Sequence, residues 1–279
     1  MASIRRTKLQ EQPIGLFDSG LGGLTVLTEV QKLLPNEDLV YFGDTARVPY
    51  GSKSASTVKQ YSLEIAEFLM DRKIKLLVIA CNTATAFALE ELQKTFPIPV
   101  IGVIEPGVQA LKEQDPHLKK AAVVATRSTI KSEAYLQVAS QLLPEMHLYS
   151  KATPLFVPLV EEGFIDKKVT ESIIAEYFDE IAREDINQVI LGCTHYPILK
   201  PVISRLYPGI NLVDSSIETA KAVRSLLSQH SILNERGQKG KTSIYVSDLT
   251  DSFNDLENIF AGKIIHNVHQ VKLEEKERA

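Results

Sequence analysis

The chain alternates short apolar runs with longer amphipathic segments along most of its 279 residues. Short apolar runs bounded by turn residues are typical of buried strands, and longer segments with apolar residues three or four apart are typical of helices. Several runs are almost continuously hydrophobic, which indicates strands buried on both faces of a sheet. The pattern therefore predicts an α/β fold built on mostly parallel sheets.

The pattern also predicts where the individual elements lie. The predicted strands are Ile14–Phe17, Leu39–Phe42, Leu76–Ala80, Pro99–Val103, Ala121–Ala125, Gln188–Leu191, Ile210–Val213 and Ser243–Val246. The predicted helices are Thr57–Asp71, Ser132–Leu142, Val169–Arg183, Ile217–Ser228 and Asp251–Phe260. No Gly/Ser-rich or strongly charged linker interrupts the series, so the sequence shows no clear domain boundary.

Composition and charge narrow the class of protein. The net charge of -4 and the pI of about 5.9 argue against a nucleic-acid binder, which usually carries a basic face. No apolar run approaches the roughly 20 residues of a membrane span. The N-terminal sequence MASIRRTKLQEQP lacks the apolar segment of a secretory signal. We therefore expect a cytoplasmic protein that binds neither nucleic acid nor membranes.

The two cysteines of the chain, Cys81 and Cys193, lie in similar surroundings. Leu76–Thr85 reads LLVIACNTAT and Val189–Pro197 reads VILGCTHYP, so each Cys follows an apolar strand and a small residue. Helical sequence is expected after each. This repeat predicts two related α/β units that each present a thiol at the carboxyl end of a strand, where ligands bind in open α/β sheets.

The position of these thiols favours reactivity. A lone Cys in an apolar run is usually an inert buried residue. Here both are expected at the N-terminus of a helix, where peptide dipoles lower the pKa of a thiol. Hydrogen-bonding pairs follow them, Asn-Thr after Cys81 and Thr-His after Cys193. A metal site of both thiols with His195 is an alternative, but it lacks the spacing of known zinc patterns.

A Gly-rich turn, IGLFDSGLGGLTVL, spans Ile14–Leu27 between a strand and a helix. It does not fit the dinucleotide pattern G-x-G-x-x-G, because position 25 is Thr, and it has no P-loop Lys. Two interpretations remain open. The glycines can expose backbone N–H groups as a nest for a small carboxylate, or the segment is a tight turn in which Asp18 caps the helix.

Further polar clusters follow predicted strands. They are DTARVPYGSKS at 44–54, TRSTI at 126–130 and PLVEEG at 158–163. The Pro-Tyr-Gly-Ser segment at 49–52 can cover a small polar substrate, or it can be an ordinary turn. Glu161 and Glu162 are adjacent carboxylates, which usually means a solvated pair, although one of them can be a catalytic partner.

Taken in order, these segments resemble the glutamate racemase family. The matching motifs are DSGLGGL at 18–24, PYGSKS at 49–54, ACNTAT at 80–85, the T-x-x-T of TRSTI, FVPLVEEG at 156–163 and GCTHYP at 192–197. Related aspartate racemases share the paired cysteines, but the DSGLGG opening and the His of CTHYP are similar to the glutamate branch. Ser128 stands where many members have Gly, and Thr153 where many have Cys.

The resemblance implies two similar lobes, each a mostly parallel sheet flanked by helices, with the active site between them. It divides the chain into a first lobe, residues 1–102 plus 216–279, and a second lobe, residues 103–215. We also expect a homodimer. The rival interpretations are a racemase for aspartate or another acid, and a non-catalytic module that binds a small ligand.

The resemblance also implies a reaction, the interconversion of L-glutamate and D-glutamate without a cofactor or metal. Such an enzyme supplies D-glutamate for peptidoglycan, and so for bacterial cell wall biogenesis and cell shape. Racemisation requires an acid and a base on opposite faces of the α-carbon, and two thiols can supply them. Cys81 would handle the proton of the D isomer and Cys193 that of the L isomer.

The expected site residues fall into two overlapping groups. The catalytic group is Cys81, Cys193, Asp18, His195 and Glu161. The substrate-binding group is Asp18, Ser19, Pro49, Tyr50, Gly51, Asn82, Thr83, Thr126, Thr129, Thr194 and His195. Asp18 is expected near Cys81, and His195 with a glutamate, Glu161 or Glu162, is expected near Cys193.

Overall fold

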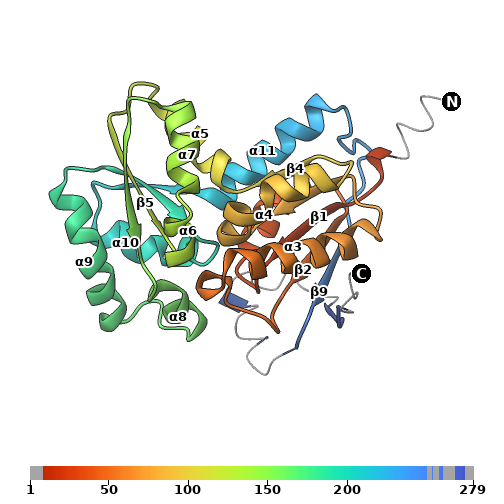
Figure 1. The fold of residues 1–279 in the computed structure, drawn as a ribbon, viewed down its shortest axis with the longest axis horizontal. Coiled ribbons are helices and arrows are strands. Elements are labelled where there is room, and N and C mark those ends of the chain that lie inside the picture. Colours follow the sequence, from red (N-terminus) through yellow and green to blue (C-terminus); the bar gives the residue numbers. More distant parts are fainter. Residues whose placement is uncertain (1–8, 250–252, 254–257, 260–267, 274–279) are drawn as a thin grey trace.

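Two parallel sheets lie side by side in the computed structural model, which describes residues 9–249, 253, 258–259 and 268–273 (Figure 1). The six-stranded sheet has the order β10-β9-β2-β1-β3-β4, and the four-stranded sheet has the order β6-β5-β7-β8. The strands of the two sheets are β1 Ile14–Asp18, β2 Leu39–Gly43, β3 Leu76–Ile79, β4 Val100–Gly102, β5 Lys120–Ala125, β6 His147–Ala152, β7 Gln188–Gly192, β8 Asn211–Asp214, β9 Thr242–Val246 and β10 Val268–Gln270. The fold class predicted from the sequence is confirmed.

Helices cover both sheets. The longer ones are α2 Leu24–Leu33, α3 Ala55–Met70, α4 Asn82–Thr95, α5 Ile104–Gln114, α7 Ala134–Leu142, α9 Lys168–Arg183 and α11 Ser215–Gln229. The shorter ones are α6 Arg127–Lys131, α8 Phe156–Glu161, α10 Lys200–Leu206 and the 3-10 turns η1 Tyr50–Ser52 and η2 Tyr196–Leu199. Helix α11 packs on both α2 and α5, and so it joins the helices of the two sheets.

The central strands are buried because helices lie on both of their faces. Every residue of β1, β2 and β3 is buried, as their continuous apolar runs predict. In the register of this sheet Ile14 pairs with Leu39 on one side and Leu76 on the other. The carboxyl ends of β1 and β3 therefore lie next to each other, and the polar residues that follow these strands meet at one edge.

The predicted strands are all present, within a residue or two at each end. The pattern does not predict β6 or β10, since both are edge strands with polar, partly exposed residues. It also does not predict α5, where Pro106 and Gly107 interrupt the first turn. Proline is tolerated there because the first N–H groups of a helix have no partner within it.

Three further sequence predictions concern two helices and the lobe boundaries. The helix predicted over Ser132–Leu142 begins later, at Ala134, because Glu133 has a left-handed backbone with φ of 59°. The helix predicted over Asp251–Phe260 lies largely outside the described residues. The division into lobes at 102/103 and 215/216 stays a prediction. Within the part of the chain that the structure describes, every helix is too short or too polar to cross a membrane.

Candidate active site

A cavity of about 480 Å³ lies where residues from the two sheets meet. Residues that follow β1 and β3 line it from the six-stranded sheet, and residues that follow β5 and β7 line it from the four-stranded sheet. Its lining is Ser19, Val48, Pro49, Tyr50, Gly51, Ser52, Cys81, Asn82, Thr83, Thr126, Arg127, Ser128, Pro154, Val157, Pro158, Glu161, Cys193, Thr194 and His195. Both thiols of the chain therefore line one pocket.

Cys81 is the N-cap of α4 and its side chain is only 6% exposed. Its Sγ accepts a hydrogen bond from the Ala84 N–H at 3.4 Å and donates to the Ser19 Oγ at 3.7 Å. Burial, with the negative charge of Asp18, raises the pKa of Cys81 to about 12. The prediction that the helix dipole lowers this pKa is therefore wrong, because desolvation outweighs the contact with the helix N-terminus.

Cys193 is equally buried, but its partners differ. The prediction of a helix start at this Cys is wrong, since a short 3-10 turn follows and its N-cap is His195. The imidazole Nδ1 lies 3.7 Å from the Sγ of Cys193, and Nε2 lies 3.1 Å from Oε1 of Glu161. The site thus has a thiol–imidazole–carboxylate series, and the carboxylate is Glu161 and not Glu162.

The charge on His195 depends on these two partners. Burial opposes protonation of the ring, but hydrogen bonds and negative charge from Cys193 and Glu161 outweigh it and raise the pKa of His195 to about 10. The structure therefore places a ring that favours its cationic form 3.7 Å from the Sγ of Cys193.

Asp18 is fully buried at the end of β1, where its charge acts on Cys81. The Gly20 N–H donates to its Oδ2 at 3.1 Å, and the Thr194 hydroxyl lies 3.5 Å from Oδ1. Burial raises the pKa of Asp18 although His195 and the backbone N–H groups of the turn oppose this. Since those N–H groups face the Asp18 carboxylate, the structure favours the tight turn over a nest open to substrate, and the N-cap of α2 is Gly23 and not Asp18.

The Gly-rich turn packs closely on the Cys193 segment at Gly22. A Cβ on Gly22 would lie 2.5 Å from the Thr194 Oγ1 and 2.6 Å from the His195 Nδ1. Real Cβ atoms do not approach other atoms so closely, so glycine is required for this contact. Thr25 on α2 also donates a hydrogen bond to the Thr194 carbonyl at 3.1 Å. The six-stranded sheet thus supports the segment that carries Cys193.

Hydroxyl groups on residues from the two sheets also contact each other beside the pocket. The Thr83 Oγ1 lies 3.1 Å from both the Thr126 and the Thr129 hydroxyls, which are 2.9 Å from each other. Ser128 donates to the Gly51 carbonyl at 2.7 Å. These contacts hold the start of α4 and the turn η1 against α6.

The structure brings together nearly all residues that the sequence predicts for the site. Asp18 and Thr129 are the exceptions, because they lie behind the lining and contact it through Thr194 and Thr83. The remaining lining residues were not predicted as site residues, namely Val48, Ser52, Arg127, Ser128, Pro154, Val157 and Pro158. Most of these lie within the motifs quoted from the sequence, and that membership is the signal that could have found them.

A buried carboxylate outside the lining was also missed. Asp44 follows β2 and accepts hydrogen bonds from Arg47 and Ser247, each at 2.8 Å, and from the Tyr50 hydroxyl. It therefore supports the turn that carries Tyr50 and Gly51. Its position three residues before Arg47 gives no sequence signal for this role.

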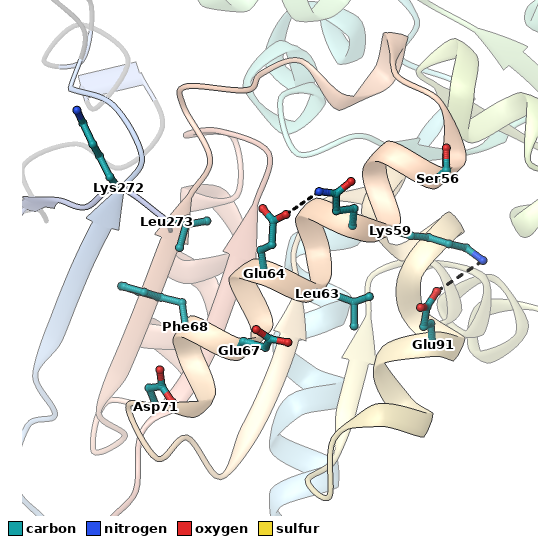
Figure 2. A pocket seen from close by; sticks show the side chains of 11 residues that line it. Ser56, Lys59, Leu63, Glu64, Glu67, Phe68, Asp71, Glu91, Lys272 and Leu273 are labelled. Atoms are coloured by element: carbon teal, nitrogen blue, oxygen red, sulfur yellow. Dashed lines mark hydrogen bonds and ion pairs between the residues drawn. The ribbon is translucent and has the colours of Figure 1, made fainter. Parts of the chain in front are cut away.

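A larger hollow of about 750 Å³ lies along α3, facing α4 (Figure 2). Its polar contacts include the ion pair of Lys59 with Glu91 at 3.7 Å, drawn in Figure 2, and the hydrogen bond from Gln60 to Glu64 at 3.0 Å. Neither thiol reaches it. The smaller cavity is therefore the candidate active site. Among the described residues, no cluster of three or more His, Cys, Asp or Glu side chains has the arrangement of a metal site.

Comparison with known proteins gives consistent matches. The Asp/Glu/Hydantoin racemase family model matches residues 23–223. The glutamate racemase of Geobacter metallireducens is 48% identical and is aligned over 95% of this chain and 98% of its own length. The glutamate racemase of Sulfurihydrogenibium sp. is 45% identical over 90% of this chain and 95% of its own.

Solved structures match over nearly the whole chain. The crystal structure of the Francisella tularensis glutamate racemase in complex with D-glutamate has a TM-score of 0.90 and 37% identity, covering 96% of this chain and 100% of that one. The Escherichia coli glutamate racemase in complex with L-glutamate and an activator has a TM-score of 0.77 and 25% identity, covering 94% and 99%. An aspartate racemase of Picrophilus torridus, 16% identical with a TM-score of 0.57, shares the fold.

Proposed function

Since this chain belongs to the Asp/Glu/Hydantoin racemase family and is an amino-acid racemase, we propose that it interconverts L- and D-glutamate without a cofactor. Cys81 and Cys193 serve as acid and base. Glutamate is proposed as the substrate because relatives at 45–48% identity carry that name. The observation that carries the mechanism is that both buried thiols line one pocket from two different sheets.

In the direction from L to D, the Cys193 thiolate removes the α-proton and becomes a thiol. The electron pair stays on the α-carbon and its carboxylate as a planar, carbanion-like intermediate. The Cys81 thiol then delivers its proton to the opposite face and becomes a thiolate. The reverse reaction starts from the thiolate of Cys81, so each enantiomer uses its own protonation state of the coupled pair.

The environments of the thiols support this starting state. The raised pKa of Cys81, to about 12, keeps it protonated as the acid. His195, with its pKa raised to about 10, is the cation that accompanies a Cys193 thiolate. The two groups are therefore unequal before substrate binds, as a proton relay in one direction requires.

The α-proton of an amino acid is very weakly acidic, and a positioned base typically contributes only about 10²–10⁴-fold. Charge that develops on the substrate carboxylate needs preorganised donors. Ser19, Asn82, Thr83 and Thr194 surround the thiols and are proposed as side-chain donors, with backbone N–H groups of the turn η1. The described residues that line the pocket include no lysine, the residue that pyridoxal phosphate enzymes use for their Schiff base.

The proposal is tested by incubating the purified protein, dialysed against a chelator, with L-glutamate alone. Chiral chromatography should show D-glutamate accumulating until the enantiomers are equal, and in D₂O deuterium should enter the α-position. L-Aspartate serves as the control substrate. Faster racemisation of aspartate would identify the other branch, and glutamate binding without α-proton exchange would identify a binding module.

The biological setting is part of the same proposal. D-Glutamate produced by this reaction would supply peptidoglycan synthesis in the bacterial cytoplasm. The bacterial relatives support this setting. The homodimer and the division into two lobes remain predictions, and sedimentation analysis tests the first of them.

A further inference from the structure

The Asn82 side chain is a buried amide whose nitrogen has an unmet hydrogen-bonding capacity. It lies at the first position of α4, directly after Cys81, and is only 2% exposed although it lines the pocket. Its Oδ1 accepts a hydrogen bond from the Tyr135 hydroxyl at 2.7 Å. Its Nδ2 finds no partner among the residues that the structure describes. One half of this amide is thus fixed by a hydrogen bond, and the other half is a buried donor without a partner.

Tyr135 reaches Asn82 from the other sheet. It belongs to α7, is 2% exposed, and packs in an apolar cluster with residues such as Val123 and Ile190 of the four-stranded sheet. Burial, with the nearby Cys193, raises the pKa of Tyr135, so its hydroxyl keeps its proton and donates it. The tyrosine does not itself line the pocket. Its position behind Asn82 is therefore set by packing and not by substrate.

An amide group is planar, and its oxygen and nitrogen lie on opposite sides of the carbonyl carbon. Because the Tyr135 hydroxyl holds Oδ1, Nδ2 must point away from Tyr135. A buried N–H group without a partner is unfavourable, whereas a carboxylate offers only acceptors. We propose that Tyr135 is a positioning residue that orients the Asn82 amide so that Nδ2 donates to a carboxylate of the substrate.

The hydroxyl matters because the two orientations of the amide are nearly the same in shape. If the amide were rotated by 180°, Oδ1 would face the negatively charged carboxylate and repel it. Without a donor at Tyr135, Oδ1 loses the bond that selects the productive orientation. The proposal rests on the proposed function, since it assumes a substrate carboxylate beside Cys81.

The test is the variant Tyr135→Phe, which keeps the ring and removes only the hydroxyl. Glutamate racemisation should show KM raised about ten-fold in both directions, the usual weight of one buried hydrogen bond, with a smaller fall in kcat. Tyr149→Phe is the matched control. Tyr149 lies on β6, and its hydroxyl bonds Glu180, which does not line the pocket. This control should have the KM and kcat of the wild type.

A double-mutant cycle separates positioning from a structural role. If Tyr135 acts through Asn82, the change Tyr135→Phe should add no further loss of kcat/KM to the variant Asn82→Ala. Losses that multiply in the double variant would overturn the proposal, as would a wild-type KM in Tyr135→Phe. Wild-type protein that does not racemise glutamate would reject the proposed function instead.

A measurement on the wild type covers the case in which Tyr135→Phe does not fold. In ¹⁵N-Asn-labelled protein, the side-chain NH₂ resonances of Asn82 are assigned by their loss in Asn82→Ala. Addition of D-glutamate should shift both proton resonances. The larger shift is expected for the proton that is donated to the carboxylate. Saturating D-glutamate without any shift of this pair would contradict the proposal.

Discussion

The Cys81 and Cys193 segments share a sequence pattern but differ in their electrostatics. Each thiol follows a buried parallel strand, and each side chain is 6% exposed. Burial and the carboxylate of Asp18 raise the pKa of Cys81 and keep it protonated, although the Ser19 hydroxyl and the Ala84 N–H oppose this. Cys193 faces an imidazole that Glu161 supports from its far side.

The difference shows that the same strand–Cys unit can have very different electrostatic surroundings, depending on what packs beside it. A racemase with two identical thiols would have no preferred direction of proton flow in its resting state. In the proposed mechanism, the thiol beside Asp18 is the acid and the thiol beside His195 is the base. Asp18 contributes on both sides, since its charge disfavours the Cys81 thiolate and favours the His195 cation.

The largest expected effect tests what the two segments share. Cys81→Ser and Cys193→Ser should each lower racemisation by at least about 10²-fold, the lower range for loss of a positioned acid or base. Initial rates from both enantiomers measure this. The variant Ser62→Ala, which removes a hydroxyl bonded to a helix carbonyl within α3, is the control and should keep its activity. Full activity in either serine variant would reject the two-thiol mechanism.

A second prediction compares the rates at which the two thiols are alkylated. At pH 8, a pKa of about 12 leaves only about one Cys81 in 10⁴ ionised, so iodoacetamide should alkylate Cys193 first. Peptide mass spectrometry of partly modified protein gives the two rates. His195→Asn should slow alkylation of Cys193 about ten-fold or more, whereas His147→Asn, at the exposed start of β6, should not. Faster modification of Cys81 in the wild type would reverse the assignment of acid and base.

The smallest expected effect concerns stability. The folded chain raises the pKa of His195 from 6.5 to about 10, so it retains a proton that the unfolded chain releases between these pH values. The resulting stabilisation is fully present below pH 6.5 and is lost as pH rises toward 10. Urea unfolding of the wild type and of His195→Asn across this range measures it.

The free energy of unfolding of the wild type should fall relative to His195→Asn as pH rises through this window. The variant His147→Asn again serves as control and should follow the wild type. A constant difference between wild type and His195→Asn at all pH values would show that the ring is not held as a cation.

The sequence predicted the fold class well because buried parallel strands have continuous apolar runs. It failed at β6, since the edge position of that strand leaves polar residues such as Lys151 on its surface. Most site residues were predicted because they follow strands or belong to motifs. Tyr135 and Asp44 were not predicted, because neither lines the pocket. Tyr135 contacts it through Asn82, and Asp44 contacts it through Tyr50.

What the sequence determined by itself is the pair of thiols and their placement, since strand periodicity fixes where each strand ends. It could not determine their unequal character. That depends on contacts between residues far apart in the chain, such as Asp18 with Thr194 and His195 with Glu161. Desolvation depends on what surrounds a group in three dimensions, so only the tertiary structure decided that Cys81 has a raised pKa and that Cys193 has a cationic neighbour.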